Sequence, residues 1–165
     1  MFFTNIISNL TFARLIEQKV FKVTHRFEDL AKDEVAYFYF SNPSGSTVSA
    51  IITLIDVVTQ GQGRIDISND FTIDVAGTDV TALNLFLGST HTSSVIVKHG
   101  GTYSNITNVL SYAAPGGTSV RAVGAANPMS EFILVPPGNK LLIQFTNTSE
   151  TTTDCSIAIV WIEAT

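Results

Sequence analysis

The sequence predicts an all-β fold, a single jelly-roll-like β-sandwich preceded by a short N-terminal helix. From Val20 onward, apolar and polar residues alternate with the period of two that is typical of half-buried strands. Clusters of Gly, Pro, Asn and Ser interrupt this alternation at regular intervals. No segment with helical periodicity separates the strands, which disfavours a parallel sheet with crossover helices. About eight to ten short strands result, and two packed four-stranded sheets account for that number best.

The length of 165 residues suits one domain with a substantial core. We divide the chain into an N-terminal helix or arm, residues 1–19, and a β-sandwich domain, residues 20–165. No internal repeat is evident in the sequence.

The helical pattern lies at the N-terminus, where Phe3, Ile6, Ile7 and Leu10 follow the i, i+3, i+4, i+7 spacing of a one-sided helix. This segment either docks on its own domain or packs as an arm on a neighbouring subunit. We favour the arm, because the β pattern is complete without it. No apolar run approaches the ~20 residues of a membrane span, and the N-terminus lacks a basic n-region and an A-x-A-like cleavage site. We therefore expect neither a membrane span nor a signal peptide.

The first half of the domain contains most of the predicted strands. Val35–Phe40 carries aromatic residues toward both faces, as expected for a strand that is covered on both sides. Asn69 and Asp70 are expected to form a tight turn between two short strands. The predicted strands are a first strand from Val20, then Val35–Phe40, Val48–Thr59, Arg64–Ile67, Phe71–Val75, Leu83–Leu87 and Ser94–Lys98.

Residues 100–130 are rich in Gly, Ala, Ser and Asn, and we expect a long exposed excursion that carries one or two short strands. Tyr103 and Tyr112 lie within it. Asn105 and Asn147 begin triplets of the N-glycosylation type in predicted exposed turns, and these triplets stay unassigned.

The closing strands are predicted at Phe132–Val135, Leu141–Thr146 and Ser156–Glu163. The period-two pattern of the last strand places Trp161 in the core of the sandwich. Cys155 is expected to be a small buried hydrophobic residue. The apolar faces of the last two strands consist of Leu141, Ile143 and Phe145, and of Ile157, Ile159 and Trp161.

Composition limits the functions that are open to the chain. Charged residues make up 14% of the sequence, against about 25% in an average soluble domain. The net charge is −5 and basic residues occur singly, so we expect no direct binding of nucleic acid. The single cysteine excludes a disulfide framework and a Cys-based zinc site. Low charge favours a surface that neighbouring subunits cover, although a surface rich in Ser and Thr would have the same composition.

The sequence contains no G-x-S-x-G elbow, no H-E-x-x-H pair and no P-loop. His91 and His99 would lie about 26 Å apart on one extended strand, too far to share a metal, and we expect all three histidines to be surface residues. The carboxylates are expected to form a solvated acidic loop (Glu28, Asp29, Asp33 and Glu34) and a polar strand face (Asp66, Asp70, Asp74 and Asp79). We therefore predict a protein that is not an enzyme and has no cofactor or metal.

Three segments together carry a resemblance to a known group of proteins. They are the turn Phe40-Ser-Asn-Pro-Ser-Gly-Ser46, the segment Leu83-Asn-Leu-Phe-Leu-Gly-Ser89, and Leu134-Val-Pro-Pro-Gly-Asn-Lys-Leu-Leu-Ile143 followed by Ile157-Ala-Ile-Val-Trp-Ile-Glu163. In order and spacing they resemble β-rich, jelly-roll-like virion structural proteins of bacterial and archaeal viruses, of the capsid or capsid-decorating type. The resemblance covers most of residues 35–163. It implies a location in the virion and carries no catalytic residues.

We therefore expect a capsid shell or capsid-decorating subunit that assembles with other copies of itself and with other virion proteins. Neutral loops can be buried against a neighbour without the cost of desolvating charges. The alternative is a host-receptor or carbohydrate-binding sandwich of a virion fibre or turret, which would display Tyr103 and Tyr112 to a sugar. The candidate contact residues for assembly are Phe3, Ile6, Ile7, Leu10, Tyr103 and Tyr112.

Overall fold

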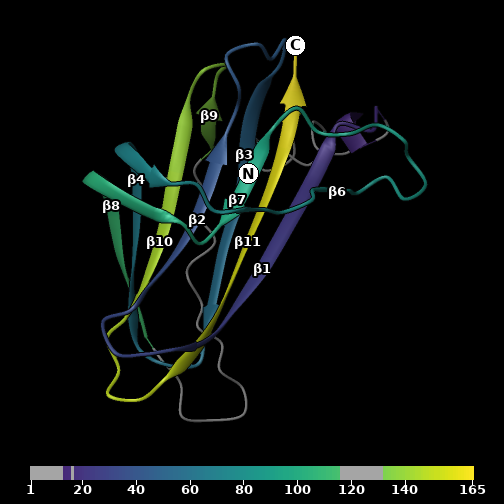
Figure 1. Ribbon diagram of the computed structural model, residues 1–165. Helices are drawn as coiled ribbons and strands as arrows, with labels where there is room; N and C mark the ends of the chain where they lie inside the picture. The colour runs from purple at the N-terminus through teal and green to yellow at the C-terminus, as the bar shows by residue number, and fades with distance from the viewer. Residues whose placement is uncertain (1–12, 16, 116–131) are drawn as a thin grey trace, which may run out of the picture.

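The computed structural model describes residues 13–15, 17–115 and 132–165 (Figure 1). Residues 13–15 are helical and lie in the segment that was predicted as a helix. The candidate contact residues Phe3, Ile6, Ile7 and Leu10 lie outside the described residues. No helix in the described part is long and apolar enough to cross a membrane.

The described residues form eleven strands, and every pairing between them is antiparallel. Their bounds are β1 (Val20–Leu30), β2 (Val35–Ser41), β3 (Ser49–Thr59), β4 (Gly63–Val75), β5 (Thr78–Asp79), β6 (Leu83–Asn84), β7 (Ile96–His99), β8 (Thr102–Ala114), β9 (Ile133–Val135), β10 (Lys140–Asn147) and β11 (Thr153–Ala164).

Two antiparallel sheets pack face to face, which confirms the predicted all-β sandwich (Figure 1). The first sheet has the order β6-β1-β11-β3-β9 and the second has the order β5-β7-β2-β10-β4-β8. The strands outside the β5–β7 segment pair as β1 with β11, β2 with β10, β3 with the short β9, and β4 with β8. This nested pairing of the first strand with the last, and so on inward, is the jelly-roll arrangement of two Greek keys. The short strands β5, β6 and β7 form an insertion between β4 and β8.

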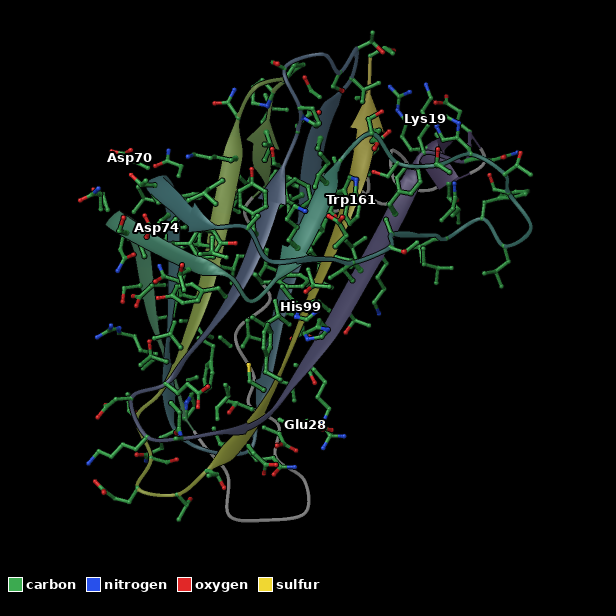
Figure 2. All side chains as sticks on the ribbon, viewed as in Figure 1. Lys19, Glu28, Asp70, Asp74, His99 and Trp161 are labelled. Atoms are coloured by element: carbon green, nitrogen blue, oxygen red, sulfur yellow. The ribbon has the colours of Figure 1, made fainter. Side chains whose placement is uncertain are left out.

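The core lies between the sheets and is built from alternate residues of their strands. Trp161 is fully buried there, as predicted (Figure 2). Its ring stacks on Phe21 at 5.8 Å between centroids and meets Phe40 edge-on at 5.3 Å. Cys155 is also buried, as predicted, and burial raises the pKa of its thiol to about 12. The other inward residues of the two closing strands, Leu141, Ile143, Phe145, Ile157 and Ile159, belong to the same cluster.

The strand β2 is covered on both faces, as its aromatic residues predicted. Phe38 and Phe40 enter the main core, whereas Tyr37 and Tyr39 point to the opposite side of the sheet. There they join a second, smaller cluster that is formed with Phe71, Tyr103 and Leu142. The ends of β4 and β8 therefore fold across the outer face of the second sheet.

The tight turn predicted at Asn69 and Asp70 is wrong, because β4 continues through both residues to Val75. The pairing of β4 with β8 contains several register shifts at this point, with Asp70 opposite Thr107. Such bulges bend a strand pair without ending it. The bend carries Phe71 over the second sheet, where the Lys140 amino group donates a hydrogen bond of 2.7 Å to the Phe71 carbonyl.

The prediction of a long exposed loop at residues 100–130 is also wrong for the first half of that range. Residues Thr102–Ala114 form the thirteen-residue strand β8, which pairs with β4 along its whole length. Ser and Asn are tolerated in this strand because their side chains have partners. The Ser68 hydroxyl donates to Asn108 Oδ1 at 2.7 Å, and the Gln144 amide donates to the same oxygen at 3.1 Å.

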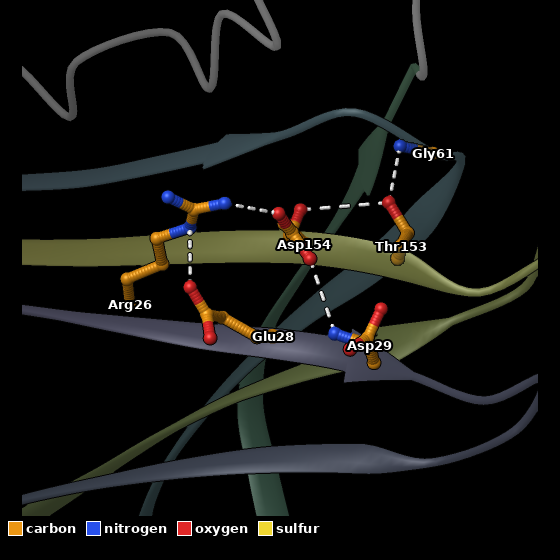
Figure 3. Close-up of polar contacts among 6 residues, drawn as sticks. All are labelled: Arg26, Glu28, Asp29, Gly61, Thr153 and Asp154. Carbon is orange, nitrogen blue, oxygen red and sulfur yellow. Dashed lines mark hydrogen bonds and ion pairs between the residues drawn. The ribbon is translucent and has the colours of Figure 1, made fainter.

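A bulge near the end of β1 is held by Asp154 (Figure 3). The register of β1 against β11 shifts between Phe27 and Leu30, and Asp29 has a positive φ of 53°. The Asp154 carboxylate accepts hydrogen bonds from the Arg26 guanidinium at 2.5 Å and from the Asp29 backbone amide at 3.0 Å. The Arg26 hydrogen bond, with the amide, holds the pKa of Asp154 below its usual range.

The predicted acidic loop is only partly correct. Its four carboxylate residues are exposed, as expected, but Glu28 and Asp29 lie in the bulge of β1, and only Asp33 and Glu34 lie in the loop that follows. The predicted polar face of aspartates is only partly correct. Asp70 and Asp74 are exposed at the outer end of β4 (Figure 2), but Asp66 is buried. Its carboxylate accepts hydrogen bonds from Arg64 at 2.7 Å and Ser111 at 2.6 Å, which compensate its desolvation.

Candidate assembly surface

The sheet order leaves four edge strands, and three of them are very short. Strands β5 and β6 have two residues each and β9 has three, whereas β8 has thirteen. An edge strand presents unpaired backbone N–H and C=O groups that can pair with another chain, and short edge strands limit this risk. In the described residues no strand pairs with the outer side of β8. Strands β6 and β9 pair with only two residues of β1 and three of β3, so much of the outer side of both strands also lacks a strand partner among the described residues. Those parts of β1 and β3 carry charged residues, whereas β8 is open along all thirteen of its residues.

The sequence of β8 lacks the usual protection of an edge strand. Natural edges commonly carry Lys, other charges or Pro, which oppose pairing with a second chain. Residues 102–114 contain no charged residue and no proline. The charged residues that give the chain its net charge of −5 all lie outside β8.

The stretch Leu110–Ala114 is the regular part of β8. It pairs without a register shift against Gly63–Ile67 of β4, with Tyr112 opposite Ile65. The first irregularity follows at Val109, which has no partner in the register. Bulges twist an edge away from a partner, so the regular stretch is the part that suits strand pairing. We call the side of Leu110–Ala114 that faces away from β4 the open edge.

Apolar side chains surround the open edge. Tyr112 is 40% exposed and Val109 52% exposed on β8, and Leu134 is 59% exposed on β9 of the other sheet. A groove of about 210 Å³ separates β8 from β9, and its lining includes Val109, Leu110, Ile133, Leu134 and Leu141. Exposed apolar residues that cluster in this way mark contact surfaces more often than isolated ones do.

The charges next to the open edge would not oppose contact between two copies of this chain. The nearest charged side chains on β4 are Arg64 and Asp66, and they form an ion pair of 2.7 Å with each other. The Asp66 carboxylate also accepts a hydrogen bond from the Ser111 hydroxyl of β8. The charges beside the open edge are therefore already compensated within the chain.

A second exposed apolar group lies in the loop around β6, on the opposite side of the molecule from β8 (Figure 1). Leu83, Phe86 and Leu87 are exposed there, Leu87 to 79%. The loop is held by the buried Asn84. Its amide donates to the carbonyls of Gln18 at 2.9 Å and His91 at 3.1 Å, and its oxygen accepts from the Phe86 backbone amide at 2.9 Å.

The carboxylate of Glu163 fixes the end of the same loop. Glu163 is buried near the end of β11, and its Oε1 accepts hydrogen bonds from the Ser93 hydroxyl at 2.6 Å and the Ser94 backbone amide at 2.8 Å. Asn84 and Glu163 lie in two of the segments that carry the sequence resemblance. Their side chains explain why polar residues occur at these strand positions.

The structure places the two predicted tyrosines differently. Tyr112 lies at the centre of the open edge, on a strand rather than a loop. Tyr103 is buried under the bent end of the β4–β8 pair, where it contacts Tyr37, Tyr39 and Phe71. Burial raises the pKa of Tyr103 to about 12. Only Tyr112 of the two is at the surface.

The two glycosylation-type triplets are also placed differently from expectation. Asn147 is not in an exposed turn: it is fully buried, and its amide donates to the carbonyls of Leu30 and Thr151, both at 2.9 Å. Asn105 is exposed, but it lies within β8 at a positive φ of 51°.

A histidine pair was missed by the sequence analysis. His25 of β1 and His99 of β7 stack across the two sheets at 3.6 Å between ring centroids, and both are half-buried. Phe27 contacts both rings edge-on. Burial, together with the nearby His99, lowers the pKa of His25 below 6.5. Only His91 is exposed, so the predicted surface position is wrong for the other two.

No protein-family model matches this chain, and a search of curated proteins finds no match.

Proposed function

We propose that this protein is a non-enzymatic structural subunit of a virus particle, a capsid shell or capsid-decorating protein that assembles through protein–protein contacts. The observation that carries the proposal is the open edge of β8. A long, uncharged edge strand flanked by exposed apolar residues is a hazard for a protein that works alone. For a protein that functions inside an assembly, the same feature is an interface.

Two further observations support the proposal. The first is the jelly-roll arrangement of the strands, which is common among viral capsid domains and also occurs in lectins and cupins. The second is the low content of charged residues, 14% of the chain, which reduces the cost of burying its surface against neighbours. The sequence resemblance to virion proteins directs the proposal to virus particles rather than to assemblies in general.

The proposal is tested on particles and on the purified protein. Particles are purified by density gradient from a culture in which the protein is produced, and its amount is measured by quantitative mass spectrometry relative to the other particle proteins. We expect the chain as a stoichiometric component, and sedimentation of the purified protein should show multimers. A stable monomer that is absent from the particles would contradict the proposal.

A further inference from the structure

We propose that the open edge of β8 pairs with the open edge of a second copy of this chain, antiparallel and centred on Tyr112. This inference rests on the proposed function and names the partner of its interface. Two identical edges related by a two-fold axis form an isologous contact, the commonest kind in homo-oligomers. The second sheet of one copy would then continue into the second sheet of the other.

The residue order of the open edge fits such self-pairing. In an antiparallel pair centred on Tyr112, Tyr112 lies opposite Tyr112, Leu110 opposite Ala114, and Ser111 opposite Ala113. Leu110 and Tyr112 share one face, because both are paired with core-facing isoleucines of β4. Aromatic and apolar residues thus meet on one face, and small residues meet on the other. Such cross-strand pairs stabilise a sheet, whereas like charges directly opposite would destabilise it.

Charge argues for a second copy over a partner of opposite charge. Two molecules that each carry a net charge of −5 repel one another over most of their surfaces. The open edge has no charge of its own, and the neighbouring Arg64 and Asp66 compensate each other. It is therefore a place where two copies can approach without direct like-charge contact. A basic or acidic partner would find no complementary charge on β8.

The test introduces a positive charge at Tyr112 in one variant and a negative charge in another. Tyr112→Lys and Tyr112→Glu are made separately, and each is examined by sedimentation velocity alone and in an equimolar mixture. Matched controls are Val58→Lys and Val58→Glu, because Val58 is 41% exposed and Tyr112 is 40% exposed, and Val58 lies on β3 of the other sheet. Melting temperatures confirm that each variant is folded.

We expect each Tyr112 variant alone to weaken association about tenfold or more, because two like charges would face each other across the axis. The mixture should restore association, and both Val58 variants should behave like the wild type. A wild-type multimer that the Tyr112 changes leave intact would overturn β8 self-pairing while the proposed function stands. Self-pairing would also be overturned if both Tyr112 variants lost association alone and their mixture did not restore it. A monomeric wild type would also overturn self-pairing, and the particle measurement would then decide the proposed function separately.

Discussion

Trp161 offers the most direct measure of what one core residue contributes. Its side chain is fully buried between Phe21 and Phe40, so Trp161→Ala should reduce the free energy of unfolding by about 3–5 kcal/mol. Trp161→Phe is the matched control and should cost less. It keeps an aromatic ring and removes the indole N–H, which has no hydrogen-bond partner among the described residues. Chemical denaturation measures both variants, and unchanged stability of the alanine variant would contradict the burial.

The stacked pair His25 and His99 predicts a pH dependence of stability. The pKa of His25 is lowered in the folded protein, from 6.5, by burial first and by His99 second. The folded state therefore binds a proton less readily than the unfolded state. Its stability should be greatest above pH 6.5 and should fall as the pH drops below that value.

Melting temperatures between about pH 7.5 and 5.5 test this dependence, because carboxyl groups titrate mostly below that range. His25→Phe keeps an aromatic ring beside Phe27 and His99 but cannot be protonated. This variant should show a smaller loss of stability on acidification than the wild type. An equal loss in both proteins would show that the pair does not cause the effect.

At the scale of elements, the loop around β6 depends on Asn84. This buried side chain supplies three hydrogen bonds that join the loop to Gln18, Phe86 and His91. Asn84→Ala should therefore loosen the loop that exposes Leu83, Phe86 and Leu87, at a local cost of about 1–3 kcal/mol.

Limited proteolysis with a protease that cleaves after Leu or Phe measures the loosening. Cleavage within residues 83–87 should become faster in the Asn84 variant, while β11 stays protected. Asn108→Ala is a suitable control, because Asn108 is also a polar partner in a strand but lies in β8. Unchanged cleavage in the Asn84 variant would contradict the role of this residue.

Local patterns predicted most elements, because strand period and turn chemistry depend on neighbouring residues. The strands at β1, β2, β3, β10 and β11 were found with errors of a few residues at their ends. The full length of β8 was not predicted, because Ser, Thr and Asn make up six of its thirteen residues and its partners Ser68 and Gln144 are distant in sequence. The continuity of β4 was missed because Asn69-Asp70 has turn chemistry, yet pairing with β8 keeps it extended.

At the scale of the whole molecule, composition predicted a covered surface but could not locate it. The open edge becomes visible only from the sheet order, which depends on the pairing of strands up to 142 residues apart, such as Val20 with Ile162. The same holds for His25 and His99, which meet across the sandwich because β1 and β7 belong to opposite sheets that pack together. Pairing between distant strands therefore sets both features, and local patterns in the sequence do not reveal that pairing.

In the proposed assembly the open edge is paired with a second copy, whereas in the monomer it is free. Amide hydrogen exchange of residues 110–114, measured over a series of protein concentrations, tests this most directly. The amides of residues 110–114 that point away from β4 should exchange slowly at high concentration and fast on dilution to the monomer. The amides that bond to β4, and those of β10 and β11, should remain protected throughout. Exchange of the outward-pointing amides that is equally fast, or equally slow, at every concentration would contradict pairing of the open edge.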